Sequence, residues 1–190
     1  DAVISIREHK LGLIHQTFEI WTQNKPYILQ EINTRVFHNY LQGLENIILV
    51  KEWLKKTNYS YEFPSPLLNQ YLNFEGKIWR LMLFVKNSIS YNRVSSLNQV
   101  KSAANCLGEF YHHLSDFNAG NLSITLPHFH HGKSITKKFE EALLNCDNKR
   151  LFSIKALISE IEKELPILKK WDEICNTLPK RVIHYDTKIN

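Results

Sequence analysis

The hydrophobic periodicity of the chain changes about halfway along, and this change most limits its fold. Up to about residue 85, short apolar runs rich in β-branched and aromatic residues are separated by turn residues, a pattern typical of strands. After residue 90, apolar residues recur every three or four positions, as in helices. The predicted strands cover residues 3–6, 17–22, 27–30, 67–72 and 78–85. We therefore predict an α+β fold in which a five-stranded antiparallel small lobe (residues 1–86) precedes a helical lobe (residues 87–190).

Helix signals fall in two places. One amphipathic helix is expected inside the strand-rich part, over residues 39–56. In the helical part, Ser96 is suited to cap a helix over residues 97–114, and Gly108 in that helix favours close backbone packing. Pro166 is expected to separate two helices. The remaining predicted helices cover residues 134–144, 152–165 and 167–178.

The composition is typical of a soluble globular protein. With 43% hydrophobic and 12% aromatic residues among 190, the chain can bury a sizeable core, and no apolar run approaches the ~20 residues that cross a bilayer. Three widely spaced cysteines suit a reducing compartment, and no secretory signal is visible. The formal net charge of +5 comes from cations scattered among acidic residues, unlike a nucleic-acid surface. We expect a cytoplasmic protein with neither nucleic-acid nor membrane partners.

The closing stretch combines a short apolar run with alternating polar side chains. Val182 and Ile183 form a β-branched pair suited to a short buried strand. His184, Asp186 and Lys188 follow at alternate positions, where a loop can position chemistry. The simpler interpretation is a surface loop in which Asp186 caps a turn. These residues alone leave both interpretations open.

Five segments, taken in order, resemble one protein family. They are Ile28-Leu29-Gln30-Glu31-Ile32-Asn33 with Val36-Phe37, then Glu45-Asn46-Ile47, Trp79-Arg80-Leu81-Met82, Leu126-Pro127-His128-Phe129-His130, and the closing His-x-Asp-x-Lys. Together they resemble the N-acetylhexosamine 1-kinase branch of the aminoglycoside phosphotransferase-like family, which has a protein-kinase-like fold. The resemblance implies a MgATP-dependent sugar kinase that phosphorylates the anomeric hydroxyl of an N-acetylhexosamine.

The resemblance also implies roles for individual residues. Asp186 would accept the proton of the acceptor hydroxyl, and Lys188 would stabilise charge on the transferring phosphoryl group. ATP and Mg²⁺ would be the cofactors. The residues expected to contact the nucleotide are Gly12 in the first hairpin loop, Gln30 on the third strand, Glu45 on the first helix, and Phe84 and Val85 at the end of the fifth strand.

The sequence departs from the family pattern at three points. Gln30-Glu31 stands where a phosphate-contacting lysine is expected, so either another cation serves or Gln30 binds through its amide. Tyr185 replaces a smaller residue. The asparagine that holds Mg²⁺ would fall one position after Asn190, so no metal ligand is assigned. We expect an N-terminal fragment that ends inside the catalytic loop, inactive alone, with an exposed apolar face where the rest of the large lobe would pack.

Two other functions stay open. Within the enzymes, the acceptor could instead be choline, homoserine or an aminoglycoside. Outside them, the chain could belong to a non-catalytic kinase-like binding module, because Glu31 and Tyr185 weaken the expected site. The histidines at 128, 130 and 131 raise a metal hypothesis, but no carboxylate or cysteine stands at ligand spacing on that element. We interpret this stretch as a loop between helices.

Overall fold

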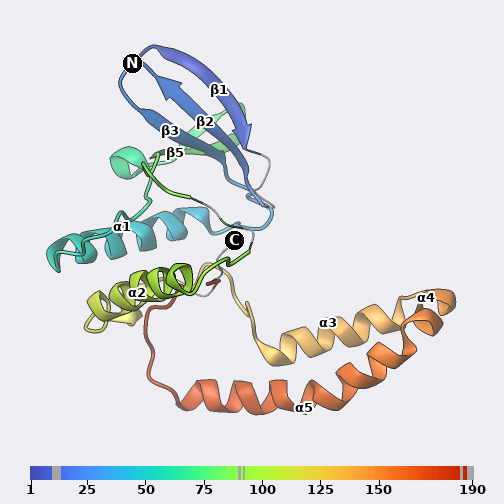
Figure 1. Cartoon of the computed structure of the whole chain (residues 1–190). Coiled ribbons are helices and arrows are strands. Elements are labelled where there is room, and N and C mark those ends of the chain that lie inside the picture. Colours follow the sequence, from blue (N-terminus) through green and yellow to red (C-terminus); the bar gives the residue numbers. More distant parts are fainter. Residues whose placement is uncertain (10–13, 90, 92, 185, 188–190) are drawn as a thin grey trace. The chain divides into compact units, whose positions relative to one another are not determined.

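A computed structural model describes residues 1–9, 14–89, 91, 93–184 and 186–187. The chain divides into two compact units (Figure 1). The first comprises Asp1–Thr125 together with Arg181–Asn190, and the second comprises Leu126–Lys180. No helix in the described ranges combines the length and apolarity that a membrane crossing needs.

The first unit is built on a five-stranded antiparallel sheet, as the periodicity predicts. The strand order across the sheet is β1-β2-β3-β5-β4, so β3 and β5 are neighbours although a helix separates them in sequence (Figure 1). Direct register pairs Thr17 with Gln30 and Gln30 with Arg80. Their side chains therefore lie on one face of the sheet. The strands are β1 (Val3–His9), β2 (Gln16–Thr22), β3 (Pro26–Glu31), β4 (Leu72–Phe74) and β5 (Lys77–Leu83).

The last hairpin is shorter than its sequence predicts. The two residues between its strands, Glu75 and Gly76, have φ values of 50° and 74°, as a two-residue type I′ turn requires. The expected strand from residue 67 is wrong at its start, because Leu68 and Asn69 also have positive φ values, 57° and 50°. These residues belong to a short 3₁₀ turn, η1 (Leu67–Asn69), and cannot continue a strand.

Two helices of the first unit meet in its main core. α1 (Tyr40–Lys56) and α2 (Leu97–His113) confirm the predicted amphipathic helices. Ser96 caps α2 in a reciprocal capping box with Gln99. The indole Nε1 of Trp53 donates to the His113 carbonyl oxygen at 2.8 Å, which ties α1 to the end of α2. The buried core consists of Val50, Leu54, Leu114 and Phe117.

The closing apolar pair does not form the predicted strand. Val182 packs against the core cluster of α1 and α2, whereas Ile183 is 52% exposed. Within the described residues, neither pairs with a strand of the sheet. β-branched residues favour an extended backbone, but a strand also needs a hydrogen-bonding partner. Ile183 is an exposed apolar residue, but the larger exposed apolar face expected around this segment stays a prediction.

The second unit is helical. It contains α3 (Gly132–Leu144), the short α4 (Asn148–Ser153) and the long α5 (Lys155–Thr177). Pro166 lies inside α5, so the predicted break is wrong. A proline in a helix interior costs ~3 kcal/mol through one lost hydrogen bond and a steric clash. Contacts that α3 makes with the turns of α5 beyond Pro166 offset this cost.

Gly132 and Asp172 carry those contacts. The backbone N–H groups of Gly132 and Lys133 each donate to the Asp172 carboxylate at 2.8 Å, so a side chain of α5 caps α3. Bonds from Lys133 and Gly132 lower the pKa of Asp172 because they favour its ionised form. A Cβ atom at Gly132 would lie 2.5 Å from the carbonyl oxygen of Leu168. The two helices thus approach as closely as a glycine allows.

Gly132→Ala is expected to destabilise the second unit by about 1–3 kcal/mol, because the new methyl group must push the α5 backbone away. Gly108→Ala is the matched control. Apart from Gly108 itself, its chain neighbours and the nearby backbone of α2, no described atom lies within 4 Å of a Cβ at Gly108, so the close packing predicted there is wrong, and alanine should stabilise α2 by about 0.5–1 kcal/mol. Amide hydrogen exchange of α2, α3 and α5 measures both effects. Unchanged protection of α3 in Gly132→Ala would contradict the close-approach argument.

Candidate functional site

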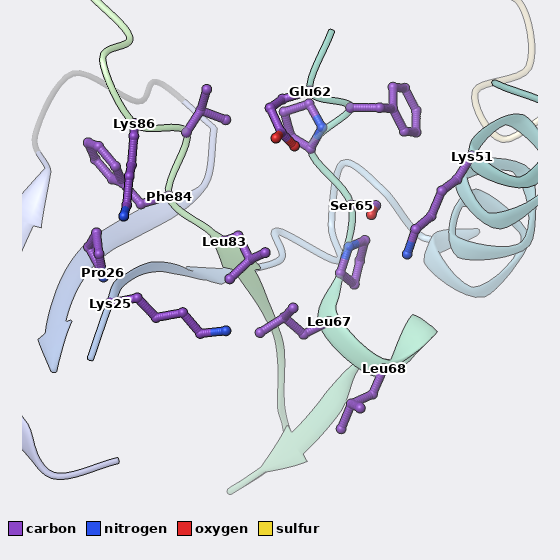
Figure 2. A pocket seen from close by; sticks show the side chains of 14 residues that line it. Lys25, Pro26, Lys51, Glu62, Ser65, Leu67, Leu68, Leu83, Phe84 and Lys86 are labelled. Carbon is purple, nitrogen blue, oxygen red and sulfur yellow. The ribbon is translucent and has the colours of Figure 1, made fainter. Parts of the chain in front are cut away.

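A pocket of about 480 Å³ opens beside the end of β5 (Figure 2). The exit segment, residues 83–86, forms one wall and includes the predicted nucleotide contacts Phe84 and Val85. The other wall is the connection from α1 to β4, residues 62–68, rather than the helices of the predicted large lobe. The volume lies in the range of small-molecule sites. The lining also includes three lysines, Lys25, Lys51 and Lys86.

The exit segment already uses part of its backbone hydrogen-bonding capacity. The N–H of Phe84 donates to the carbonyl oxygen of Pro26 at 3.4 Å, which extends the pairing of β3 and β5. The hydroxyl of Ser88 donates to the carbonyl oxygen of Val85 at 2.7 Å. The Phe84 ring lies 6.0 Å from the Trp21 ring on β2, centroid to centroid. These contacts hold the segment against the end of the sheet at which β5 finishes.

A row of polar side chains crosses strands β2, β3 and β5, away from the exit segment. Gln30 donates through Nε2 to the Thr17 hydroxyl at 2.9 Å and accepts from Arg80 Nε at 2.9 Å. Thr17 is buried, and Gln30 and Arg80 are partly buried. The side-chain amide of Gln30 is therefore committed at both its nitrogen and its oxygen. Gln30 positions Arg80 instead of offering an unused amide.

Arg80 is a partly buried cation on β5 that was not among the predicted site residues. The Tyr71 hydroxyl lies near its guanidinium, and burial lowers the pKa of Arg80, although an arginine stays charged. Nearby His15 has a lowered pKa, first because of burial and then because of the Arg80 charge. Among the described residues, Arg80 forms no salt bridge with any carboxylate. The signal for it was a charged residue inside the apolar run of β5, but its partner Gln30 lies fifty positions away.

Neither the predicted contact Glu45 nor Glu31, the acid next to Gln30, forms an ion pair with Arg80. Glu31 forms an ion pair with Lys77 at 2.8 Å. Glu31 is one residue from Gln30 on β3, and Lys77 is three residues from Arg80 on β5. Because side chains alternate between faces along a strand, this ion pair lies on the opposite face of the sheet from the Gln30–Arg80 pair. Glu45 is exposed on α1 and makes no ion pair with any described residue. The strand-to-helix Lys–Glu pair of kinases therefore has no counterpart in this part of the chain.

The predicted catalytic loop is anchored on α2. The backbone N–H of His184 donates to the Tyr111 hydroxyl at 3.3 Å, two residues after Val182 enters the core. Asp186 follows and is exposed. Gly12 and Lys188 lie outside the described residues. The catalytic roles of Asp186 and Lys188 stay predictions.

The histidine stretch lies in the second unit. His131 Nε2 lies 3.6 Å from the Asp172 carboxylate, so this histidine joins the contact between α3 and α5. The rings of His128 and His131 are 5.6 Å apart. No set of three or more His, Cys, Asp or Glu side chains in the described ranges is arranged to hold a metal ion.

Comparison with known proteins places the fold. No protein-family model matches the sequence. Spectinomycin phosphotransferase APH(9)-Ia, solved with ADP and spectinomycin, is similar to this chain with a TM-score of 0.53 and 10% identity, over 94% of this chain and 54% of its own. A thermostable mutant of aminoglycoside phosphotransferase APH(4)-Ia, in its apo form, is similar with a TM-score of 0.52 and 10% identity, over 92% of this chain and 57% of its own.

The chain thus spans a little more than half the length of each of these proteins. The likeness confirms the predicted α+β architecture of a five-stranded lobe followed by part of a helical lobe. The N-acetylhexosamine 1-kinase branch is a finer assignment that this likeness does not address. At 10% identity it is the fold that is shared, and this chain has the protein-kinase-like fold of the aminoglycoside phosphotransferases.

Proposed function

We propose that the full-length protein is an ATP-dependent phosphotransferase that acts on a hydroxyl group of a small molecule. The observation that carries this proposal is the His-x-Asp-x-Lys segment, which follows the point where Val182 enters the core and His184 bonds to α2. The similar APH(9)-Ia structure contains ADP, which supports nucleotide use. In this proposal, residues 1–86 form the nucleotide-binding lobe and residues 87–190 begin the large lobe.

Phosphoryl transfer depends mainly on positioning and on charge stabilisation. Asp186 accepts the proton of the attacking hydroxyl, and Lys188 stabilises charge on the transferring phosphoryl group. The exit segment, residues 83–86, provides one end of the nucleotide site. Bound Mg²⁺ supplies neutralisation of phosphate charge in reactions of this kind. The described residues group no three metal ligands, so no step here depends on the position of the ion.

The acceptor proposed is the anomeric hydroxyl of an N-acetylhexosamine. This assignment rests on the Leu29-Gln30-Glu31-Ile32-Asn33 and Glu45-Asn46-Ile47 segments. Spectinomycin in the APH(9)-Ia complex keeps an aminoglycoside-type acceptor as the second candidate. A non-catalytic binding module is the third, because β3 carries no lysine and Glu31 is paired with Lys77. Assays with N-acetylglucosamine, N-acetylgalactosamine, spectinomycin, choline and homoserine separate these candidates.

The full-length protein is expected to bind MgATP with a dissociation constant on the order of 1 μM to 1 mM, the usual range for enzyme substrates. Isothermal titration calorimetry with MgATP, and with adenosine for the base alone, measures this. ATP binding together with turnover of one acceptor supports the enzyme. ATP binding without turnover of any acceptor favours the binding module. No heat of binding at millimolar nucleotide would refute both nucleotide-dependent functions.

A further inference from the structure

No carboxylate among the described residues forms an ion pair with Arg80. A guanidinium has five N–H donors; Arg80 Nε donates to the amide oxygen of Gln30, and the nearby Tyr71 hydroxyl is also uncharged. A partly buried charge without an opposite charge is costly to hold. A bound anionic ligand would remove that cost, because it would supply the missing negative charge and accept hydrogen bonds from the remaining N–H groups.

The surroundings of Arg80 favour an external anion over a protein carboxylate. Thr17, Gln30 and Tyr71 are uncharged at neutral pH, and the lowered pKa of His15 keeps its imidazole neutral there. The nearest acidic position on β3, Glu31, faces the other side of the sheet and is held by Lys77 at 2.8 Å. Arg80 is not fully buried, so part of the residue stays exposed.

The place of Arg80 along β5 matches the phosphate end of a nucleotide. Arg80 lies three residues before Leu83, where the exit segment begins, which corresponds to about 10 Å along a strand. This is comparable to the distance between the base and the phosphates of an extended nucleotide. Its partner across the ladder is Gln30, which occupies the position where a phosphate-contacting lysine was expected. Thr17, in the same row, follows closely after the connection from β1 to β2.

We propose that Arg80 is the phosphate-binding cation of the nucleotide site, and that it replaces the missing third-strand lysine from the neighbouring strand. This inference rests on the proposed function. Gln30 is then a positioning residue, because its amide oxygen orients the guanidinium while its nitrogen is held by Thr17. A cation displaced by one strand moves by about 4.8 Å, which is within the reach of an arginine side chain.

The experiment compares ATP, ADP and adenosine binding by calorimetry in the full-length protein. Arg80→Met should weaken ATP and ADP binding about ten- to a hundredfold, the value of a charge-assisted hydrogen bond, and leave adenosine binding unchanged. The control is Lys77→Met, which removes the same charge from the opposite face of β5 and should leave ATP affinity unchanged. Arg80→Lys keeps the charge and should weaken ATP binding less than Arg80→Met.

A relocated cation separates a binding role from a structural one. The double variant Gln30→Lys with Arg80→Met places a lysine on β3, opposite the vacated position, and should bind ATP more tightly than Arg80→Met alone. It also tests the inference if Arg80→Met is too unstable to purify, since its ATP affinity should then approach that of wild type.

The outcomes distinguish this inference from the proposed function. ATP affinity unchanged in Arg80→Met, or ATP and adenosine affinities reduced equally, would overturn the role of Arg80 while leaving nucleotide binding intact. Failure of the wild-type protein to bind both ATP and adenosine would instead refute the proposed function. Equal weakening of ATP binding by Lys77→Met and Arg80→Met would mean that the loss of affinity follows from the change in net charge alone. That result would also overturn the specific role of Arg80.

Discussion

Asp186→Asn is expected to lower the turnover of the full-length protein at least about a hundredfold, since a positioned general base contributes ~10²–10⁴-fold in rate. The substitution keeps the shape of the side chain and removes its negative charge and its ability to take a proton. ATP affinity should change far less, because the proposed nucleotide contacts are in β5 and the exit segment that follows it, about a hundred residues before this loop in sequence. Steady-state kinetics with the best acceptor, together with calorimetric ATP binding, measures the two effects separately.

Asp116→Asn is the matched control for this experiment. Asp116 is an exposed aspartate just beyond α2, so its substitution makes the same chemical change at a position without a predicted role. Its turnover should equal that of wild type. If Asp186→Asn also turned over like wild type, Asp186 could not be the base. A fall in both turnover and ATP affinity would instead indicate that Asp186 acts mainly in holding the nucleotide.

Local sequence patterns were sufficient for most of the elements. The capping pair Ser96 and Gln99 marks the start of α2, and the Glu75-Gly76 turn joins β4 to β5. Such features act within a few residues and can be recognised without knowledge of the fold. The order of a strand-rich part and a helical part also predicts the α+β class. These local signals therefore account for the agreement between the predicted and observed architecture.

The errors occur where distant residues decide the local structure. Pro166 stays inside α5 because Leu168 and Asp172 pack against α3, some forty residues earlier. Val182 lacks a strand partner among the described residues and enters the helical core instead. Leu68 has a left-handed backbone that its apolar side chain does not signal. Local propensity predicted a different backbone conformation at each of these residues, and tertiary contacts or backbone geometry overrode that propensity.

The candidate site shows the same division. Gln30 was recognised as a departure from the expected lysine, but the replacement cation could not be chosen among the chain's 24 lysines and arginines from sequence alone. The register of β3 against β5 identifies it, because that register sets Arg80 directly opposite Gln30. A pattern search that tests only the expected position fails when the charge has moved to the adjacent strand. Pairing, and not propensity, carries this information.

Leu54→Ala is expected to destabilise the first unit by about 2–5 kcal/mol. Leu54 is 2% exposed and packs with Val50, Leu114 and Phe117, where α1 meets the end of α2. The substitution removes buried methyl groups and leaves a cavity that these neighbours cannot readily fill, because the Trp53 bond to the His113 carbonyl oxygen fixes the helices. The midpoint of urea unfolding, with an unchanged slope, measures the loss.

Leu41→Ala on the same helix is the control. Its side chain is 56% exposed, so the same truncation should change the free energy of unfolding by no more than about 0.5 kcal/mol. Because Val182 packs against the Leu54 cluster, hydrogen exchange at His184 should also become faster in Leu54→Ala, but not in Leu41→Ala. Loss of stability without faster exchange at His184 would mean that this core does not hold the segment leading to Asp186. An equal loss of stability in both variants would show that the contact between α1 and α2 is not the main core of this unit.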